Sequence, residues 1–187
     1  MRGSVTQLDL NHLTEETIKQ VSGVQHRAPI KCIKWQPEQS NVFATAGQDG
    51  SVMMADLRCS SGLIGNMNGC HQLNATNSKS RSTMTGLVYH PLRPELFYTT
   101  GTPDTCIRLW DMRKMSNNSN NNNINSTRNR RSKSNSLSPV EEFSTFTRKH
   151  RSSVALTIDS IGSRLFLASS NDRYTLLNEC WLFIHFL

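Results

Sequence analysis

The chain has 187 residues, 36% of them hydrophobic and 19% charged, with a formal net charge of +7. This length and composition fit one globular domain with a modest core. A charge this positive indicates an anionic partner only when it is spread over a folded surface. Here much of it lies in one Asn/Ser-rich stretch, so it does not by itself indicate a nucleic-acid-binding protein.

The cysteines and the apolar runs exclude further classes of protein. The five cysteines are odd in number, widely spaced and without a CxxC pair, which argues against a disulfide framework or a zinc site and favours a reducing compartment. Residues Met1–Leu10 hold no apolar run typical of a signal peptide. The apolar run Cys180–Leu187 is far too short to span a bilayer, so we expect no membrane association.

Short runs of β-branched and aromatic residues, bounded by Gly, Pro, Asn and Asp, predict an all-β chain. Inner strands are expected in three units, at Ile30–Trp35, Val42–Ala46 and Ser51–Asp56, then at Met84–Tyr89, Leu96–Thr100 and Cys106–Asp111, and then at Val154–Ile158, Arg164–Ser169 and Tyr174–Asn178. Outermost strands are harder to place because they are short and exposed. The candidates are Thr17–Val21, Leu63–Asn66 and Glu141–Phe146.

A short phrase recurs along the chain, in Gly3–Asn11, Gly50–Arg58 and Cys106–Arg113. Each copy is a short strand that ends in Asp, and the third keeps a Trp before the Asp, as is typical of WD repeats. The interval from the second residue after the first strand (Pro37, Pro91, Ser160) to the Gly or Ser after the second strand (Gly47, Gly101, Ser170) is ten residues in all three units. The expected fold is therefore a WD-repeat β-propeller fragment, with about three blades plus part of a preceding one.

The repeats are unevenly spaced, because Asp9 to Asp56 is 47 residues and Asp56 to Asp111 is 55, against roughly 40–45 for an ordinary unit. The excess lies in polar inserts, which a propeller tolerates between blades. The expected segments are the tail of a preceding blade at 1–11, WD repeats at 12–68, 84–115 and 139–178, the last of them degenerate, a polar insert at 69–83, an Asn/Ser-rich basic insert at 116–138 and an atypical apolar tail at 179–187.

WD repeats often hold each blade by a hydrogen-bonded set of a His, a Ser or Thr, an Asp and a Trp, which satisfies polar groups that the blade buries. We expect these residues to be structural and not catalytic. They are His26, Thr45 and Asp49 in the first unit, with Ala55 in place of the Trp; Thr99, Asp104 and Trp110 in the second, with no obvious His; and His150 and Asp172 in the third, with Asn178 in the Trp position.

Two arginines stand apart from this set. Arg58 and Arg113 each follow an Asp by two residues, at Asp56 and Asp111, where a third strand ends. A single arginine there is most often a solvated surface residue, but two consecutive units carry one. A planar guanidinium makes bidentate contacts with carboxylates or carbonyls, which gives orientation as well as attraction. These four residues are therefore candidates for contact with a partner.

The phrases at Asp56 and Trp110 resemble the "WDxR" boxes with which propeller substrate receptors dock on the adaptor of cullin-4 RING ubiquitin ligases. Gly47–Cys59, Ile107–Lys114 and Ser153–Phe166 together with Asn171–Asn178 are similar to the central propeller of the denticleless family. This resemblance implies a nuclear substrate receptor whose adaptor is a damaged-DNA-binding protein subunit. It also implies substrates of the replication-licensing type, presented on the sliding clamp, and adaptor contacts through Arg58 and Arg113.

The sequence departs from that family in ways that bear on stability. The family has seven blades, of which about three are present, and the segment 179–187 does not continue its pattern. A propeller fragment leaves open sheet faces and edges, so we expect the chain alone to be poorly stable or prone to aggregation.

Other functions stay open. A basic tract fits a nuclear localisation signal, a nucleic-acid contact or a solvated linker; it comprises Arg128, Arg130, Arg131 and Lys133. It has no interleaved aromatic residues for base stacking, which disfavours specific recognition of a single strand. No Gly-rich phosphate loop, GxSxG or HExxH motif is present, so we expect no enzyme, cofactor or metal. The alternatives are a general WD-repeat scaffold in another nuclear complex and a nucleic-acid binder.

Overall fold

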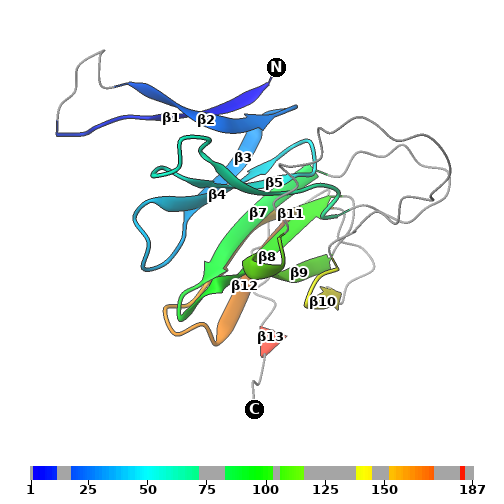
Figure 1. The fold of residues 1–187 in the computed structure, drawn as a ribbon. Helices are drawn as coiled ribbons and strands as arrows, with labels where there is room; N and C mark the ends of the chain where they lie inside the picture. Colours follow the sequence, from blue (N-terminus) through cyan, green and yellow to red (C-terminus); the bar gives the residue numbers. More distant parts are fainter. Residues whose placement is uncertain are drawn as a thin grey trace, which may run out of the picture.

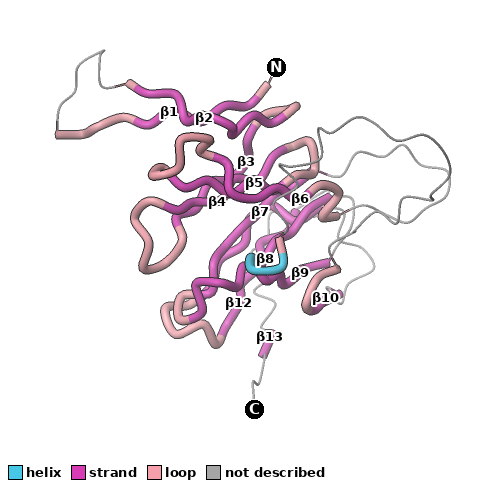
Figure 2. The backbone as a smooth tube through the Cα atoms, in the orientation of Figure 1, coloured by secondary structure: helices cyan, strands magenta, loops and turns pink. Residues whose placement is uncertain are grey.

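The structure, a computed structural model, describes residues 2–11, 18–71, 83–102, 106–115, 138–144, 152–170 and 182–183. Across these residues the chain is all-β, as the sequence predicted, with a single 3-10 turn, η2, at Met112–Lys114. The strands form four separate antiparallel sheets that follow one another in chain order (Figure 1). Loops and turns connect the successive strands β3 to β6, as the backbone trace shows (Figure 2).

We number the sheets I to IV by their order along the chain. Sheet I pairs β1 (Gly3–Gln7) with β2 (Lys19–His26), and sheet II is the meander β3 (Ile30–Trp35), β4 (Val42–Gly47), β5 (Val52–Asp56) and β6 (Leu63–Met67). Sheet III is the meander β7 (Thr83–His90), β8 (Arg93–Thr102), β9 (Cys106–Asp111) and β10 (Glu141–Ser144). Sheet IV contains β11 (Ser152–Ile158), β12 (Arg164–Ser170) and β13 (Leu182–Phe183).

The inner strands of sheets II and III lie close to their expected positions, and the bounds of β3 and β9 match the prediction. The main difference is β8, which begins at Arg93 where the sequence predicted a start at Leu96. Its first residues are polar and include a proline, so they lack the composition of a strand, yet they pair with β7 directly after a tight turn. The strand expected at Tyr174–Asn178 lies outside the described residues.

Two sheets cross the boundaries expected from the sequence. Strand β2 pairs with β1, Gly3 opposite His26, so sheet I extends beyond the boundary expected between residues 11 and 12. Strand β10 pairs with β9 and belongs to sheet III, although it begins the expected unit 139–178. The reason is the same in both places: the chain that leaves the inner strands turns back as an outer strand of the same sheet. The Gly, Pro, Asn and Asp residues of the sequence indicate where a loop lies, but they do not indicate with which strand the next segment pairs.

Three apolar layers fill the spaces between successive sheets. Val21 and Val24 of sheet I pack with Phe43 and Ala55 of sheet II. The other face of sheet II packs on sheet III through a layer that includes Ala44, Met54, Leu87, Tyr89 and Trp110. The layer between sheets III and IV includes Tyr98, Leu109, Leu156 and Leu165. Alternate residues of one strand therefore serve two different interfaces, as the pleat requires.

Gly86 shows how closely sheets III and IV approach. A Cβ built on Gly86 would lie 2.8 Å from Thr100 Cγ2 and 2.9 Å from Leu156 Cβ. The contact tolerates only glycine without a shift of the sheets.

Candidate docking site

Asp56 and Asp111 end the third strands of sheets II and III, and each binds the arginine two residues further on. Arg58 donates to Asp56 from its backbone N at 2.9 Å and from Nε at 3.0 Å, both to Oδ1, and from Nη2 to Oδ2 at 2.8 Å. Arg113 donates to Asp111 from the same three atoms at 3.0, 3.0 and 2.8 Å. The two Asp-x-Arg pairs therefore have the same geometry, a local turn closed by the Asp side chain.

Burial differs within each pair. The side chains of Asp56 and Asp111 are 12% and 8% exposed, whereas those of Arg58 and Arg113 are 62% and 68% exposed. Hydrogen bonds from the Arg58 and Arg113 side chains hold the pKa of Asp56 and of Asp111, respectively, below its ordinary value, and each carboxylate raises the pKa of its arginine. In each pair, a largely buried Asp carboxylate therefore binds an Arg guanidinium that is exposed to solvent.

Both arginines lie at the same edge of the stacked sheets. In sheet II, the backbone N of Leu57 donates to Asn41 O in the β3–β4 turn at 2.9 Å. From the start of that turn Gln36 Nε2 reaches sheet III, where it contacts Pro94 O at 3.0 Å and Met112 Sδ at 3.3 Å. This chain of contacts joins the residue before Arg58 to the residue before Arg113, so the two guanidinium groups share one rim, which we call the arginine rim.

The arginine rim offers a partner two guanidinium groups, each with N–H groups that can donate hydrogen bonds. Nε and one hydrogen of Nη2 face the Asp, while Nη1 and the outer hydrogen of Nη2 point away from it. A guanidinium only donates hydrogen bonds and stays charged, so its partner groups are carboxylates and carbonyl oxygens. Because Asp56 and Asp111 already fix the orientation of the two guanidinium groups, the arginine side chains lose less conformational entropy when a partner binds them.

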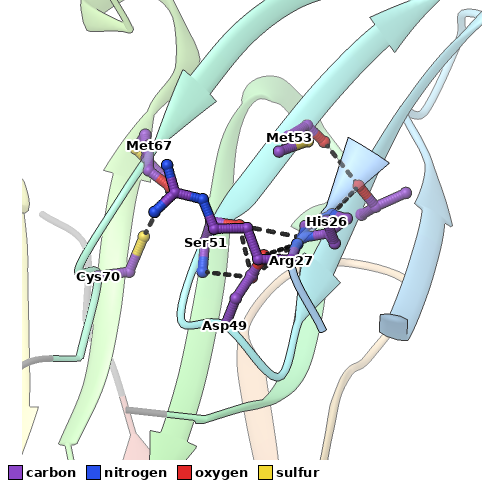
Figure 3. Close-up of polar contacts among 8 residues, drawn as sticks. His26, Arg27, Asp49, Ser51, Met53, Met67 and Cys70 are labelled. Carbon is purple, nitrogen blue, oxygen red and sulfur yellow. Dashed lines mark hydrogen bonds and ion pairs between the residues drawn. The ribbon is translucent and has the colours of Figure 1, made fainter. Parts of the chain in front are cut away.

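The expected polar set of the first unit is assembled between His26 at the end of β2 in sheet I and the residues Thr45 and Asp49 of sheet II. His26 Nε2 lies 2.8 Å from Thr45 Oγ1, and His26 Nδ1 lies 3.1 Å from Asp49 Oδ1 (Figure 3). An ionised carboxylate only accepts, so the proton of this contact sits on Nδ1. The hydroxyl of Thr45 donates to Met53 O at 3.3 Å. The sequence did not single out Ser51, which donates from Oγ to Asp49 Oδ1 at 2.6 Å.

Asp49 is the acceptor that ties this set together. Partial burial raises its pKa, but hydrogen bonds from Ser51, His26 and the Arg27 amide outweigh burial and leave the pKa below its ordinary value. A charged Asp49 therefore stabilises the turn between β4 and β5, and these contacts are consistent with the structural role expected for His26, Thr45 and Asp49. Their place, between sheets I and II at the end of β2, is remote from the arginine rim.

The second unit has a histidine that the sequence analysis missed. His71 Nε2 lies 2.8 Å from Thr99 Oγ1, which also accepts from Trp110 Nε1 at 2.7 Å. Trp110 Nε1 can only donate, so the Thr99 hydroxyl oxygen is the acceptor of that bond. A polar insert separates His71 from β7, whereas His26 lies just before β3. The interval from His71 to Thr99 is therefore longer than that from His26 to Thr45, so a search at a fixed spacing does not find His71.

Several expected site residues lie outside the described part of the chain: Asp104, His150, Asp172, Arg128, Arg130, Arg131 and Lys133. Within the described residues no group of three or more His, Cys, Asp or Glu side chains is arranged to hold a metal ion. No helix among them is long and apolar enough to cross a membrane.

Comparison with known proteins adds no assignment. No protein-family model matches the sequence, and no curated protein matches it as a relative.

Proposed function

We propose that sheets I to IV are consecutive blades of a WD-repeat β-propeller fragment. The support is the equivalence of sheets II and III, residue by residue. Thr45 and Thr99 each face a buried histidine. Phe43 pairs with Ala55 and Phe97 pairs with Trp110, directly before Asp56 and Asp111. Repeated meanders stacked in chain order are the arrangement of propeller blades.

We further propose that this chain is the substrate-recognition subunit of a cullin-4 RING ubiquitin ligase and that the arginine rim binds the ligase adaptor. The observation that carries the proposal is the duplicated Asp-x-Arg geometry. Blade packing does not use either guanidinium, since both are largely exposed. Even so, each guanidinium donates from Nε and Nη2 to a carboxylate that is mostly buried. Orientation of an exposed charge in two successive sheets is suited to recognition.

The resemblance to the denticleless family supplies the rest of the proposal. The receptor acts in the nucleus and directs ubiquitination of replication-licensing and cell-cycle proteins presented on the sliding clamp. The chain has a non-catalytic role in this account: it orients the substrate, and the ligase transfers the ubiquitin. The proposal ascribes no step to bound nucleic acid.

The test is co-purification of the adaptor with the Arg58→Ala plus Arg113→Ala double variant. We expect the adaptor to be lost while the circular dichroism spectrum stays unchanged. Arg27→Ala is the matched control. Arg27 precedes β3 and Arg58 follows β5, so in this antiparallel sheet the two arginines lie at opposite ends of the strands. Retained adaptor in the double variant would overturn the proposal, and a pull-down without any cullin or adaptor peptide would favour a general WD-repeat scaffold.

A further inference from the structure

The turns β3–β4 and β7–β8 occupy equivalent places in sheets II and III. The segments 36–42 and 90–96 are equal in length, and each is closed by a pair of aromatic residues. Glu38 and Leu92 therefore correspond: each follows the proline of its turn and is exposed. We call these two residues the turn tips. Figure 1 shows both turns on the same side of the stacked sheets.

Each turn also borders the arginine of its own sheet. In sheet II, Asn41 O of the β3–β4 turn accepts from the backbone N of Leu57, the residue before Arg58. In sheet III, β8 begins directly after Leu92 and contacts η2, which contains Arg113. A partner bound to the arginine rim therefore lies beside both turn tips.

The two Asp-x-Arg pairs do not by themselves distinguish one sheet from the next. Their hydrogen bonds are the same, and the exposure of their arginines is nearly equal. A partner that used only these pairs would bind equally well when displaced by one sheet. The turn tips differ, because Glu38 is an anion and Leu92 is apolar. Differences of this kind at equivalent positions can fix the register of an interface.

Glu38 has an unfavourable backbone conformation. Its φ is 67°, and in the described part of the chain no other residue except glycine has a positive φ. Gln39 N donates to Gln36 O at 3.3 Å across the turn, and Glu38 takes the third position, where a type II turn ordinarily has Gly or Asn. Gln36 Nε2 anchors the turn to Pro94 O of sheet III at 3.0 Å. Strained residues of this kind cluster at functional sites, which favours a role for the Glu38 carboxylate in recognition.

Leu92 has a second exposed apolar side chain in the next turn along the rim. Leu92 is 66% exposed, and Ile161 of the β11–β12 turn is 64% exposed. The two turns pack together, since a Cβ built on Gly162 would lie 2.7 Å from His90 Nε2. The acid of segment 90–96, Glu95, lies beyond the tip and is partly buried. Exposed apolar groups beside an arginine are the composition of an interface centre.

We propose that the turn tips Glu38 and Leu92 set the register of the partner on the arginine rim. At sheet II the partner offers an oxygen acceptor to Arg58 and a cationic side chain to Glu38. At sheet III it offers an acceptor to Arg113 and an apolar surface to Leu92. This inference rests on the proposed docking function of the arginine rim and adds the residues that distinguish its two halves.

The experiment exchanges the two tips. The variant Glu38→Leu plus Leu92→Glu has the composition and net charge of the parent chain, and only the order of the groups along the rim changes. We expect purified adaptor to bind it at least about tenfold more weakly than the parent, since the loss of a central interface contact commonly has an effect of this size. Circular dichroism checks that the exchanged variant is folded.

Two single variants separate charge from backbone strain. Glu38→Gln removes the charge but keeps the size of the side chain, so we expect weaker binding at an unchanged melting temperature. Glu38→Asn carries the same amide and tolerates positive φ, so we expect equally weak binding and a higher melting temperature. A purely structural role for Glu38 would change the melting temperature and leave the affinity as in the parent.

The outcomes distinguish this inference from the proposed function. If the adaptor binds the exchanged variant as tightly as the parent but is lost from Arg58→Ala plus Arg113→Ala, only the role of the turn tips is overturned. Parent affinity in Glu38→Gln would likewise overturn the contact between Glu38 and a cationic group. A parent chain that does not bind the adaptor would overturn both proposals.

Discussion

Sheets II and III fill the equivalent position of their third strands with residues of very different size. Trp110 fills the core of sheet III and donates to Thr99, whereas Ala55 stands at the matching position of sheet II. In sheet II the space is taken by Val21, Val24 and Met53, which pack around Ala55 and Phe43. Even so, the Asp-x-Arg pairs that follow are superimposable in their hydrogen bonds.

This comparison separates two roles that a Trp-Asp-x-Arg phrase combines. The Trp belongs to the interior of its sheet, where it satisfies a threonine hydroxyl. The Asp and the Arg form a local turn that needs no tryptophan, because its bonds connect residues two positions apart. The loss of the Trp in one copy therefore changes the core of the sheet and leaves the orientation of the exposed arginine intact.

Trp110→Ala tests whether the role of the Trp is separate from that of the Asp-x-Arg turn, and it has the largest expected effect on stability. Trp110 is 3% exposed, and truncation of a buried tryptophan costs about 3–5 kcal/mol of unfolding free energy. Urea denaturation followed by circular dichroism measures the loss, and Trp110→Phe, which removes the donor to Thr99 but keeps an aromatic ring, should cost less. If the two roles are separate, folded Trp110→Ala protein should bind the proposed adaptor as the parent chain does; a loss of affinity without unfolding would show that the orientation of Arg113 depends on Trp110.

Asp49 offers a test of the polar set in sheet II. Asp49→Ala removes the acceptor shared by His26 and Ser51, which we expect to destabilise the fold by about 1–3 kcal/mol. The folded-state pKa of Asp49 lies below its ordinary value of 3.8, so its contribution is present above pH 3.8 and is lost as the pH falls through the folded value. Urea midpoints measured from pH 6 downward should therefore fall less steeply in Asp49→Ala than in the parent; equal slopes would contradict this role.

Ala55→Trp asks whether the missing tryptophan can be restored. Ala55 is fully buried against residues that already fill its surroundings, so we expect overpacking to cost about 1–3 kcal/mol, despite a possible new bond to Thr45. Thermal unfolding measures the change, with Ala55→Gly as the control for loss of packing. A rise in the melting temperature would mean that sheet II has kept room for the tryptophan and that the two sheets differ less than described.

The elements that could be predicted from the sequence are those that depend on residues close together in the chain. The runs at Ile30–Trp35 and Cys106–Asp111 have strand composition between clear turn residues, and the structure forms strands there. The Asp-x-Arg turns were likewise placed correctly at strand ends, because an Asp that accepts from the amide two residues ahead is a local motif.

Long-range pairing accounts for what the sequence did not contain. His71 joins Thr99 across a polar insert, and Ser51 resembles an ordinary turn residue until Asp49 and His26 are brought beside it. The sheet to which β2 and β10 belong depends on hydrogen bonds between strands, and strand periodicity carries no record of them. Nor does the sequence indicate that Trp35 is 54% exposed, because a tryptophan in an inner strand is ordinarily expected to be largely buried.

We propose that the arginine rim docks the adaptor through two guanidinium groups whose orientation Asp56 and Asp111 already fix. The most direct measurement is the affinity of purified adaptor for the parent chain, for Arg58→Lys plus Arg113→Lys and for Arg27→Lys. Lysine keeps the charge and removes the planar fork, so we predict a loss of at least about tenfold in the rim variant and none in the Arg27 control. Unchanged affinity in the rim variant would contradict the account.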